Sequence, residues 1–311
     1  MDSLIDLSIV VPVYRSEDAL PELVKQVNDV LAKSNYRFEI LLVDDCSPDG
    51  SWRVIQELAG KFPFVRGVSL RKNFGQHNAT MAGLRFVRGS IVIIMDDDLQ
   101  HPPGSILSLA KEIENGADVC YTKYRHRKHA LWKKLGSNLN DKMATWLLKK
   151  PGGIYLSSFK ALKKSVVDEI ILYDGPHTYI DGLIIACTDS IASIEVDHRE
   201  RWTGKGNYNI RRSLSLWLKM ATGSSIVPLR FATIAGFFFS AASALVFMYV
   251  IAERLGNPEL QPGWTSLIAT VLLIGGVQMC FLGIIGEYIG RIHVKLNRYP
   301  QFVVGKTTFD T

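Results

Sequence analysis

Short apolar runs and amphipathic segments alternate along the first 210 residues of the chain. The apolar runs are nearly continuous, as in strands that are buried on both faces of a sheet. The segments between them carry apolar residues at helical spacing. This alternation predicts an α/β fold with a parallel sheet that helices cover on both sides. The predicted strands and helices occupy, in order, residues 7–14, 17–34, 38–45, 52–61, 64–70, 76–87, 90–98, 102–115 and 117–123.

Two much longer apolar runs follow toward the C-terminus. Residues 231–252 and 260–286 contain no charged side chain. Each run is long enough to cross a hydrocarbon core about 30 Å thick. A polar turn with two prolines, Glu253–Gly263, joins them. A buried helix of a soluble protein can be this apolar, but two such runs in succession favour a transmembrane hairpin.

Charge is distributed unevenly along the chain. The net charge is +6, yet residues 121–164 alone hold 12 basic residues and one acid. Such a block can bind nucleic acid, anionic lipid or a phosphorylated substrate, and no nucleic-acid-binding motif accompanies it. Basic residues also precede the first apolar run and follow the second. The positive-inside rule therefore predicts that both termini are cytoplasmic.

Two basic segments that also carry Trp and Leu, residues 129–150 and 210–222, are predicted to form amphipathic helices in the headgroup layer of a membrane. Packing of these helices on the sheet is the alternative. The four cysteines include no CxxC pair, which excludes a zinc ribbon and a thioredoxin-like site.

Acidic residues end two of the predicted strands. Asp44 and Asp45 follow the second strand, Asp96–Asp98 follow the fourth, and Tyr14 ends the first. Since the carboxyl ends of parallel strands share one edge of a sheet, we expect these side chains to lie together. An Asp-x-Asp followed by Gln100 offers oxygen ligands for Mg²⁺ or Mn²⁺. The alternative is that these acids only cap the helices that follow. Three consecutive acids, Asp96–Asp98, argue against it.

Other nucleotide-binding signatures are absent from the sequence. No GxGxxG follows the first strand, and Gly305-Lys306-Thr307 lacks the earlier glycine of a phosphate-binding loop. The histidines form no metal-spaced pair on a recognisable element. His77, at the start of a predicted helix, is expected to be structural or to support a site residue, rather than to be catalytic.

Five segments together resemble a known family. They are VVPVYRSED, LLVDDCSPDG, RKNFGQHNATMAG, IIMDDDLQHPP and GIIGEYIGRI. The chain resembles glycosyltransferase family 2 over essentially its whole length. More closely, it is similar to the membrane-attached polyprenyl-phosphate glycosyltransferases, which are relatives of dolichyl-phosphate mannose synthase and of the bacterial enzymes that load undecaprenyl phosphate.

The resemblance implies a GT-A fold, a Rossmann-like and mostly parallel α/β sheet, with a C-terminal two-helix transmembrane hairpin. It implies a cytoplasmic catalytic domain over residues 1–209 and a juxtamembrane amphipathic helix over 210–227. The hairpin would cover 228–290, with spans at about 231–252 and 265–287, and a cytoplasmic tail would cover 291–311.

The resemblance also implies roles for individual residues. Asp96, Asp98, Arg201 and Asp181 would be catalytic, although a buried structural role is equally open for Asp181. Metal ligands would be Asp96, Asp98 and Gln100, and the acceptor phosphate would bind Arg125, Ser158 and Lys160. The residues implied to bind the nucleotide-sugar are Pro12, Tyr14, Ser16, Glu17, Val43, Asp45, Asp96, Asp97, Asp98, Lys123, Arg201 and Lys205.

Several positions depart from the family pattern. Ser16 stands where the family often has Glu, and Asn207 stands where it has a basic residue. Lys123 and Lys160 replace arginines. These departures leave the base and the sugar open.

The function implied by the resemblance is transfer of one sugar, with inversion, from a nucleotide-sugar to a polyprenyl phosphate at the cytoplasmic face of the inner membrane. We expect a UDP-sugar as the donor, undecaprenyl phosphate as the acceptor, and Mg²⁺ or Mn²⁺ as the cofactor. A lipid phosphate oxygen is already a nucleophile, so no strong base is required. The other expected partners are the membrane and further copies of the chain in a tetramer, with no nucleic acid.

Two alternatives remain open. The first is a processive polysaccharide synthase, because His198-Arg199-Glu200-Arg201-Trp202 nearly matches the QxxRW motif of those enzymes. The second is a non-catalytic membrane scaffold, against which the acid clusters at strand ends argue.

Overall fold

The computed structural model of the chain contains two compact units, Met1–Tyr208 with Arg298–Thr311, and Asn209–Asn297. The structure describes residues 5–124, 154–175, 178–196, 229, 232–239, 241–242, 245, 248–249, 263–297 and 299–310. Both predicted amphipathic segments, 129–150 and 210–222, lie outside these residues.

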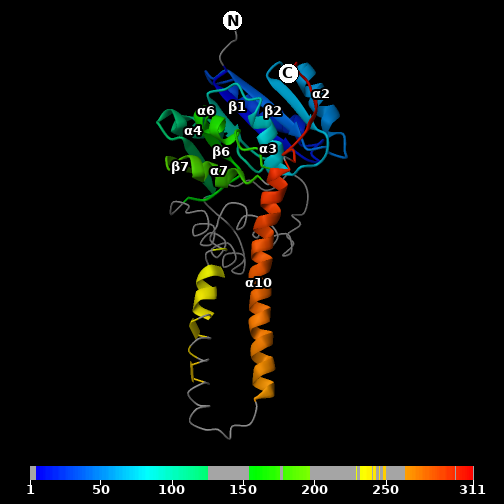
Figure 1. Cartoon of the computed structure of the whole chain (residues 1–311). Coiled ribbons are helices and arrows are strands. Elements are labelled where there is room, and N and C mark those ends of the chain that lie inside the picture. The colour runs from blue at the N-terminus through cyan, green and yellow to red at the C-terminus, as the bar shows by residue number, and fades with distance from the viewer. Residues whose placement is uncertain are drawn as a thin grey trace. The chain divides into compact units, whose positions relative to one another are not determined.

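The first unit is built on one sheet with the strand order β7-β5-β6-β4-β1-β2-β3-β8 (Figure 1). Strands β1 to β4 run parallel, and β5 is parallel to β7. β6 and β8 are antiparallel to their neighbours. The predicted, mostly parallel sheet is therefore confirmed. The strands are β1 (Leu7–Val13), β2 (Phe38–Asp44), β3 (Val65–Leu70), β4 (Ile91–Ile94), β5 (Val119–Tyr124), β6 (Lys160–Lys163), β7 (Ile191–Val196) and β8 (Val304–Thr307).

Helices cover both faces of this sheet, as the alternating pattern predicts. One face carries α1 (Leu20–Leu31), α2 (Ser51–Lys61) and α4 (Ser105–Glu114). The other face carries α3 (Gln76–Leu84), α6 (Lys164–Ile170) and α7 (Ile180–Cys187).

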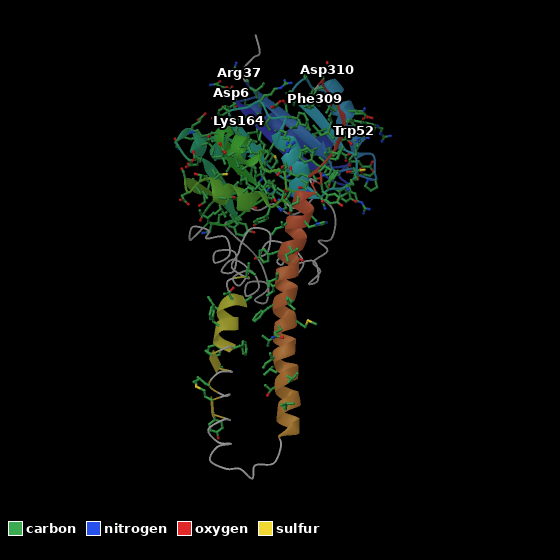
Figure 2. The ribbon with its side chains drawn as sticks, in the orientation of Figure 1. Asp6, Arg37, Trp52, Lys164, Phe309 and Asp310 are labelled. Atoms are coloured by element: carbon green, nitrogen blue, oxygen red, sulfur yellow. The ribbon has the colours of Figure 1, made fainter. Side chains whose placement is uncertain are left out.

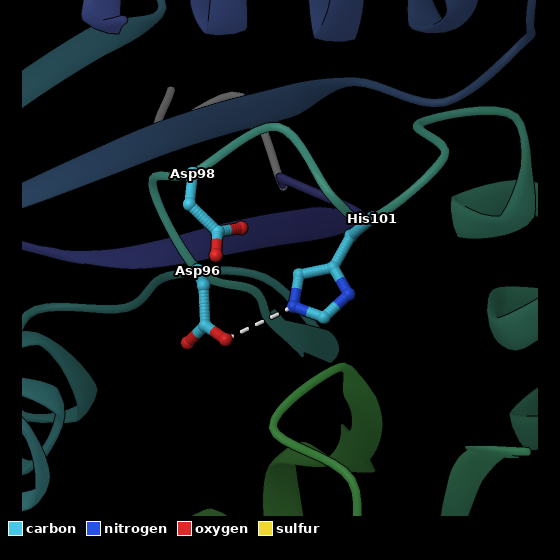
Figure 3. A group of neighbouring side chains, drawn as sticks. All are labelled: Asp96, Asp98 and His101. Atoms are coloured by element: carbon cyan, nitrogen blue, oxygen red, sulfur yellow. Dashed lines mark hydrogen bonds and ion pairs between the residues drawn. The ribbon is translucent and has the colours of Figure 1, made fainter. Parts of the chain in front are cut away.

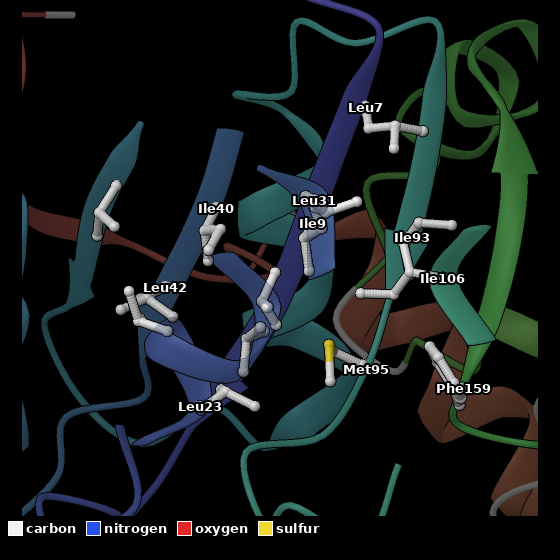
Figure 4. Close-up of a cluster of buried hydrophobic side chains, with 14 of the residues drawn as sticks. Leu7, Ile9, Leu23, Leu31, Ile40, Leu42, Ile93, Met95, Ile106 and Phe159 are labelled. Atoms are coloured by element: carbon white, nitrogen blue, oxygen red, sulfur yellow. The ribbon is translucent and has the colours of Figure 1, made fainter. Parts of the chain in front are cut away.

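The two hydrophobic cores explain why the central strands are apolar at successive positions. Ile9 and Val11 on β1 point into the core beneath α1, and Val10 between them points into the core beneath α3. Figure 4 shows the first core, where Leu23 and Leu31 of α1 meet strand residues such as Ile9. A strand covered on both faces needs apolar side chains on both, which removes the alternation of a half-exposed strand.

Several element boundaries differ from the sequence prediction, and two of them flank the three acids. The predicted strand 90–98 is too long, because β4 ends at Ile94 and the three acids lie on the loop that follows. Pro102 and Pro103 lie before α4 rather than in its first turn. Their carbonyls accept the N–H groups of Ser105 and Ile106 in the turn that leads into the helix.

The end of the chain belongs to the sheet of the first unit. β8 pairs antiparallel with β3, and the Gly67 N–H donates to Thr308 Oγ1 at 2.8 Å. Beyond the strand, the Arg66 guanidinium lies 3.8 Å from the ring centroid of Phe309, which Figure 2 labels. The sequence analysis predicts no strand in the tail over residues 291–311, because four residues that include Gly305 and Lys306 carry no strand pattern.

The second unit contains the helix α10 (Trp264–Leu296). Its stretch Leu273–Val294 is long and apolar enough to cross a membrane. Large apolar side chains along it, such as Leu273, Met279 and Leu282, are exposed in this unit. The first predicted span, 231–252, is described only in part. Two spans therefore stay a prediction.

A buried ionic network ties the central strands together at the edge opposite the carboxyl ends. Glu39 on β2 accepts hydrogen bonds from Ser8 Oγ at 2.6 Å, from the Arg88 N–H at 2.8 Å and from Arg66 Nη1 at 2.8 Å. The side chains of Arg66 and Glu39 are only 11% and 3% exposed. Burial lowers the pKa of Arg66, and the hydrogen bond to Glu39 opposes this. The Glu39 carboxylate is thus the counter-charge of Arg66, and its hydrogen bonds join three chain segments.

We expect Glu39→Gln to destabilise the protein by about 3 kcal/mol, because it leaves the buried Arg66 without its counter-charge. Denaturant unfolding of the full chain in detergent measures the loss. The matched control is Glu57→Gln, which removes the exposed partner of Arg53, 3.8 Å away. That change is expected to cost less than about 1 kcal/mol. Equal losses for the two variants would contradict the assigned role of the network.

Candidate functional site

The carboxyl ends of β1, β2 and β4 open into one pocket of about 380 Å³. β1 pairs in parallel register with both β2 and β4, so the residues that follow these strands reach the same edge. The expected gathering is confirmed for Tyr14, Asp45 and the acid triplet, but not for Asp44, which is outside the pocket lining and accepts hydrogen bonds from the Ser47 N–H and the Ser69 hydroxyl. The pocket is lined by Pro12, Val13, Tyr14, Asp45, Asn73, Gly75, Gln76, Asp96, Asp97 and Asp98.

The loop after each of the three strands contains a residue with left-handed backbone. Arg15 has φ 58°, Cys46 has φ 55° and Leu99 has φ 59°. This conformation is unfavourable for residues that carry a Cβ, so surrounding contacts must hold it. The side chain of Leu99 is 5% exposed and packs in the core beneath α1 and α4. The turns keep the acids at the mouth of the pocket instead of continuing the strands.

Asp45 joins the end of β2 to the start of α3. Its carboxylate accepts the backbone N–H groups of Phe74 at 2.7 Å and of Gly75 at 2.8 Å. Burial raises the pKa of Asp45, and these two hydrogen bonds oppose the rise. Gly75 has φ +88°, a conformation that glycine adopts without strain. Asp49, not Asp45, contacts α2, the helix that follows β2. Its carboxylate accepts the N–H of Ser51, the first residue of that helix, at 3.2 Å.

Asp96 has donors on both carboxylate oxygens. Gln76 Nε2 donates to Oδ1 at 2.7 Å, and Ser158 Oγ donates to Oδ2 at 2.6 Å. His101 Nε2 lies 3.1 Å from the same Oδ2. Burial favours the neutral acid, but the bonds from His101 and Ser158 and the nearby charge of Lys160 outweigh it and lower the pKa of Asp96. Asp96 is therefore a fixed, ionised group.

Asp97 closes the loop that follows β1. Its Oδ2 accepts the Tyr14 N–H at 3.1 Å and the Ser16 hydroxyl at 2.5 Å. Burial raises the pKa of Asp97 to about 6; the two hydrogen bonds oppose the rise, and the charges of Asp96 and Asp98 add to it. The adjacent acids Asp96 and Asp97 thus have different environments, with opposite shifts of the pKa.

Asp96, Asp98 and His101 form a group that could hold a metal ion (Figure 3). One ligand atom from each lies within 4.8 Å of the others. Two carboxylates and an imidazole suit Mn²⁺, and the carboxylates alone suit Mg²⁺. Gln100, the third predicted ligand, lies on the same loop, and its N–H donates to Asp98 Oδ1 at 3.1 Å.

A buried charged cluster lies next to Asp96 on β6 and α7. Lys160, which is 4% exposed, forms an ion pair with Asp181 in the first turn of α7. Tyr121 on β5 donates its hydroxyl to Asp181 Oδ1 at 2.8 Å. Burial and the charge of Asp181 raise the pKa of Tyr121, so it remains a donor. Ser158, two residues before Lys160, connects this cluster to the carboxylate of Asp96.

The remaining predicted site residues fall in several places. Glu17 accepts the N–H of Gly50 at 2.7 Å and so joins the loops after β1 and β2. The side chain of Val43 is fully buried in the core beneath α3, and Lys123 is exposed on β5; neither lines the pocket. Arg125, Arg201 and Lys205 lie outside the described residues.

Sequence reasoning missed His101, Tyr121 and Gln76, which lines the pocket and donates to Asp96. For His101 the available signal is its position three residues after Asp98. Tyr121 has no such signal, because only the fold brings a residue in the middle of β5 to Asp181.

The model of glycosyl transferase family 2 matches residues 8–171, which is more than half of the chain. This chain belongs to glycosyl transferase family 2. A second family model, the GtrB C-terminal hairpin, matches residues 227–292. The family makes the protein a glycosyltransferase, and the predicted resemblance and enzyme class are confirmed.

Among curated proteins, the chain is similar to two enzymes named undecaprenyl-phosphate 4-deoxy-4-formamido-L-arabinose transferase. The one from Pseudomonas savastanoi pv. phaseolicola is 33% identical over 308 residues, which cover 96% of this chain and 90% of that protein. The one from Proteus mirabilis is 31% identical over 303 residues, which cover 96% and 93%.

Solved structures support the fold. Glucosyl-3-phosphoglycerate synthase from Mycobacterium tuberculosis in complex with UDP matches with a TM-score of 0.52 at 16% identity, covering 70% of this chain and 79% of that chain. This likeness, together with the family match, confirms the predicted GT-A fold.

We expect Asp98→Asn to weaken Mn²⁺ binding about tenfold or more, because it removes a carboxylate charge from the group that could hold the ion. Calorimetric titration of the full chain with Mn²⁺ measures this. The control is Asp118→Asn, since Asp118 lies 3.9 Å from Lys163 and does not line the pocket. Unchanged Mn²⁺ affinity in Asp98→Asn would place the metal elsewhere.

Proposed function

We propose that the chain transfers a single sugar from a nucleotide-sugar to a polyprenyl phosphate, and that this lipid is undecaprenyl phosphate. The observation that carries the proposal is similarity over 96% of the chain to enzymes whose names state this acceptor. A pocket lined by carboxylates at the strand ends supports it, because a diphosphate with a bound cation suits such a site.

On the donor side, Pro12, Tyr14 and Asp45 would bind the nucleoside, and the Asp96–Asp98 loop would face its diphosphate. Ser16 and Glu17 would hold the surrounding loops in place, as their bonds to Asp97 and Gly50 suggest. Lys123, Arg201 and Lys205 would supply positive charge to the phosphates, and Val43 would shape the base site from the core. We propose a UDP-sugar as the donor.

Mg²⁺ or Mn²⁺ would be held by Asp98 and Asp96, with His101 or Gln100 completing the ligand set. When bound, it would stabilise the charge on the leaving nucleoside diphosphate. Gln76 and Ser158 keep the Asp96 carboxylate oriented toward that position by donating to both of its oxygens.

On the acceptor side, Ser158, Lys160 and Arg125 would bind the lipid phosphate. A phosphate oxygen would form a bond to the anomeric carbon while the bond from that carbon to the nucleoside diphosphate breaks, so the anomeric centre inverts. The phosphate oxygen carries its own electron pair and no proton must be removed. In this proposal Asp181 therefore acts as the counter-ion of Lys160 rather than as a base.

The proposed site of action is the cytoplasmic face of the inner membrane. The match of the hairpin model over residues 227–292 and the apolar stretch Leu273–Val294 support a membrane location. Two spans with both termini cytoplasmic, and assembly into a tetramer, are part of the proposal.

The test is a product analysis with the full-length chain in vesicles that contain undecaprenyl phosphate and Mn²⁺ or Mg²⁺. A panel of UDP- and GDP-sugars is supplied, including UDP-4-deoxy-4-formamido-L-arabinose. We expect one sugar per lipid by mass spectrometry, from a UDP-sugar. A long polymer would instead indicate a processive synthase, and the absence of any glycosylated lipid across the panel would contradict the proposal.

The pair Lys160–Asp181 offers a sharper test of the acceptor side. If Lys160 donates to the lipid phosphate, Lys160→Met should lower acceptor efficiency about 10- to 150-fold, the loss of one charge-assisted hydrogen bond. The double variant Lys160→Met/Asp181→Leu should stay impaired, because removing the counter-ion does not restore the phosphate contact. Initial rates at subsaturating lipid measure both.

The control for this pair is Lys164→Met, which breaks the more exposed ion pair to Asp168 on α6 and should leave the rates unchanged. Recovery of activity in the Lys160→Met/Asp181→Leu variant would show that the two charges only compensate one another.

A further inference from the structure

Gln301 is a buried polar residue to which the proposed reaction assigns no role. Gln301 is only 5% exposed. Nε2 donates to Thr178 Oγ1 at 2.5 Å and to the carbonyl of Gly175 at 3.2 Å. Among the described residues, its Oε1 has no hydrogen-bond partner. Burial of an amide costs free energy that hydrogen bonds must offset, so these two contacts fix Gln301 against Gly175 and Thr178.

The segment that carries Gln301 is anchored to the edge of the sheet. The Arg71 N–H donates to the carbonyl of Val303 at 2.9 Å, and β8 continues the pairing with β3. The Arg85 guanidinium lies 4.8 Å from the ring centroid of Phe302. Gln301 therefore presents its amide from a rigid support. In the sequence it follows the end of α10 by five residues.

Thr178, which accepts a hydrogen bond from Gln301, lies two residues before the start of α7. Thr178 is followed by Tyr179, whose ring packs edge-on against His77 at 5.4 Å between centroids. Asp181 lies two residues further on and pairs with Lys160. His77 is adjacent to Gln76, the donor to Asp96. A displacement of Thr178 would therefore move Asp181, the partner of Lys160. It would also move Tyr179, whose ring contacts His77 on α3.

We propose that Gln301 is a positioning residue for the acceptor side of the site. By fixing Thr178 it sets the start of α7, so that Asp181 holds Lys160 beside Asp96 and Ser158. This inference rests on the proposed function, since it assumes that the Lys160 side of the pocket receives the lipid phosphate. It adds a role for the returning C-terminal segment, which would order the acceptor side without contacting either substrate.

The test separates acceptor binding from donor binding in the full-length protein. Gln301→Leu removes both donated hydrogen bonds at nearly constant volume, and Thr178→Val removes one of them from the other side. We expect each to raise the apparent KM for undecaprenyl phosphate about tenfold, as for a lost hydrogen bond between buried groups. The Kd for UDP in the presence of Mn²⁺ should change less than about twofold. The double variant should be no worse than Gln301→Leu alone, because both changes break the same contact.

The matched control is Thr308→Val, which removes the hydroxyl that accepts the Gly67 N–H elsewhere in the same returning segment. It should leave both the lipid KM and the UDP Kd unchanged. Equal effects of Thr308→Val and Gln301→Leu, parallel loss of donor and acceptor binding, or wild-type lipid KM in Thr178→Val would each overturn the inference. A wild-type chain that binds UDP but not undecaprenyl phosphate would overturn the proposed function, and this inference with it.

Discussion

Mutual repulsion among carboxylates at one edge of the sheet is the constraint on which the rest of the site depends. Parallel register between β1, β2 and β4 brings the loops that carry these acids to the same edge. The structure compensates them one at a time. Backbone N–H groups donate hydrogen bonds to Asp45, side-chain donors from two other segments donate to both oxygens of Asp96, and the loop after β1 donates to Asp97. The left-handed residues Arg15 and Leu99 lie in the loops that these bonds hold.

This compensation has a chemical consequence. An anionic diphosphate enters such a pocket only if a cation offsets the remaining negative charge, since like charges a few ångströms apart repel strongly where water is scarce. Asp96 is ionised and already hydrogen-bonded on both oxygens, so its orientation does not have to change when a cation arrives. Preorganised charge of this kind lowers the reorganisation needed during reaction. The same carboxylate accepts the Ser158 hydroxyl, so Asp96 borders both the pocket and the segment that leads to Lys160.

The sequence predicted those features that depend on local pattern. The nearly continuous apolar runs predicted a sheet that is covered on both faces. The acids at the strand ends predicted the edge of the sheet at which the pocket lies. It could not predict contacts between distant segments, such as Tyr121 with Asp181, because no one-dimensional pattern connects a mid-strand position to the start of a helix. β8 was missed for a related reason: four residues with Gly305 and Lys306 become a strand only because β3 offers an unpaired edge.

Because β8 pairs with β3, the chain returns to the first unit after the apolar C-terminal segment. Residues 209–297 are an insertion between two parts of one compact unit, rather than an appendage to its end. The part of the chain that returns to this unit is held through Gln301, which contacts Thr178, and through β8, which pairs with the edge of β3. Thr178 lies two residues before α7, and Asp181 in the first turn of that helix pairs with Lys160. Contacts made by the last residues of the chain therefore reach the element that holds the buried Lys160.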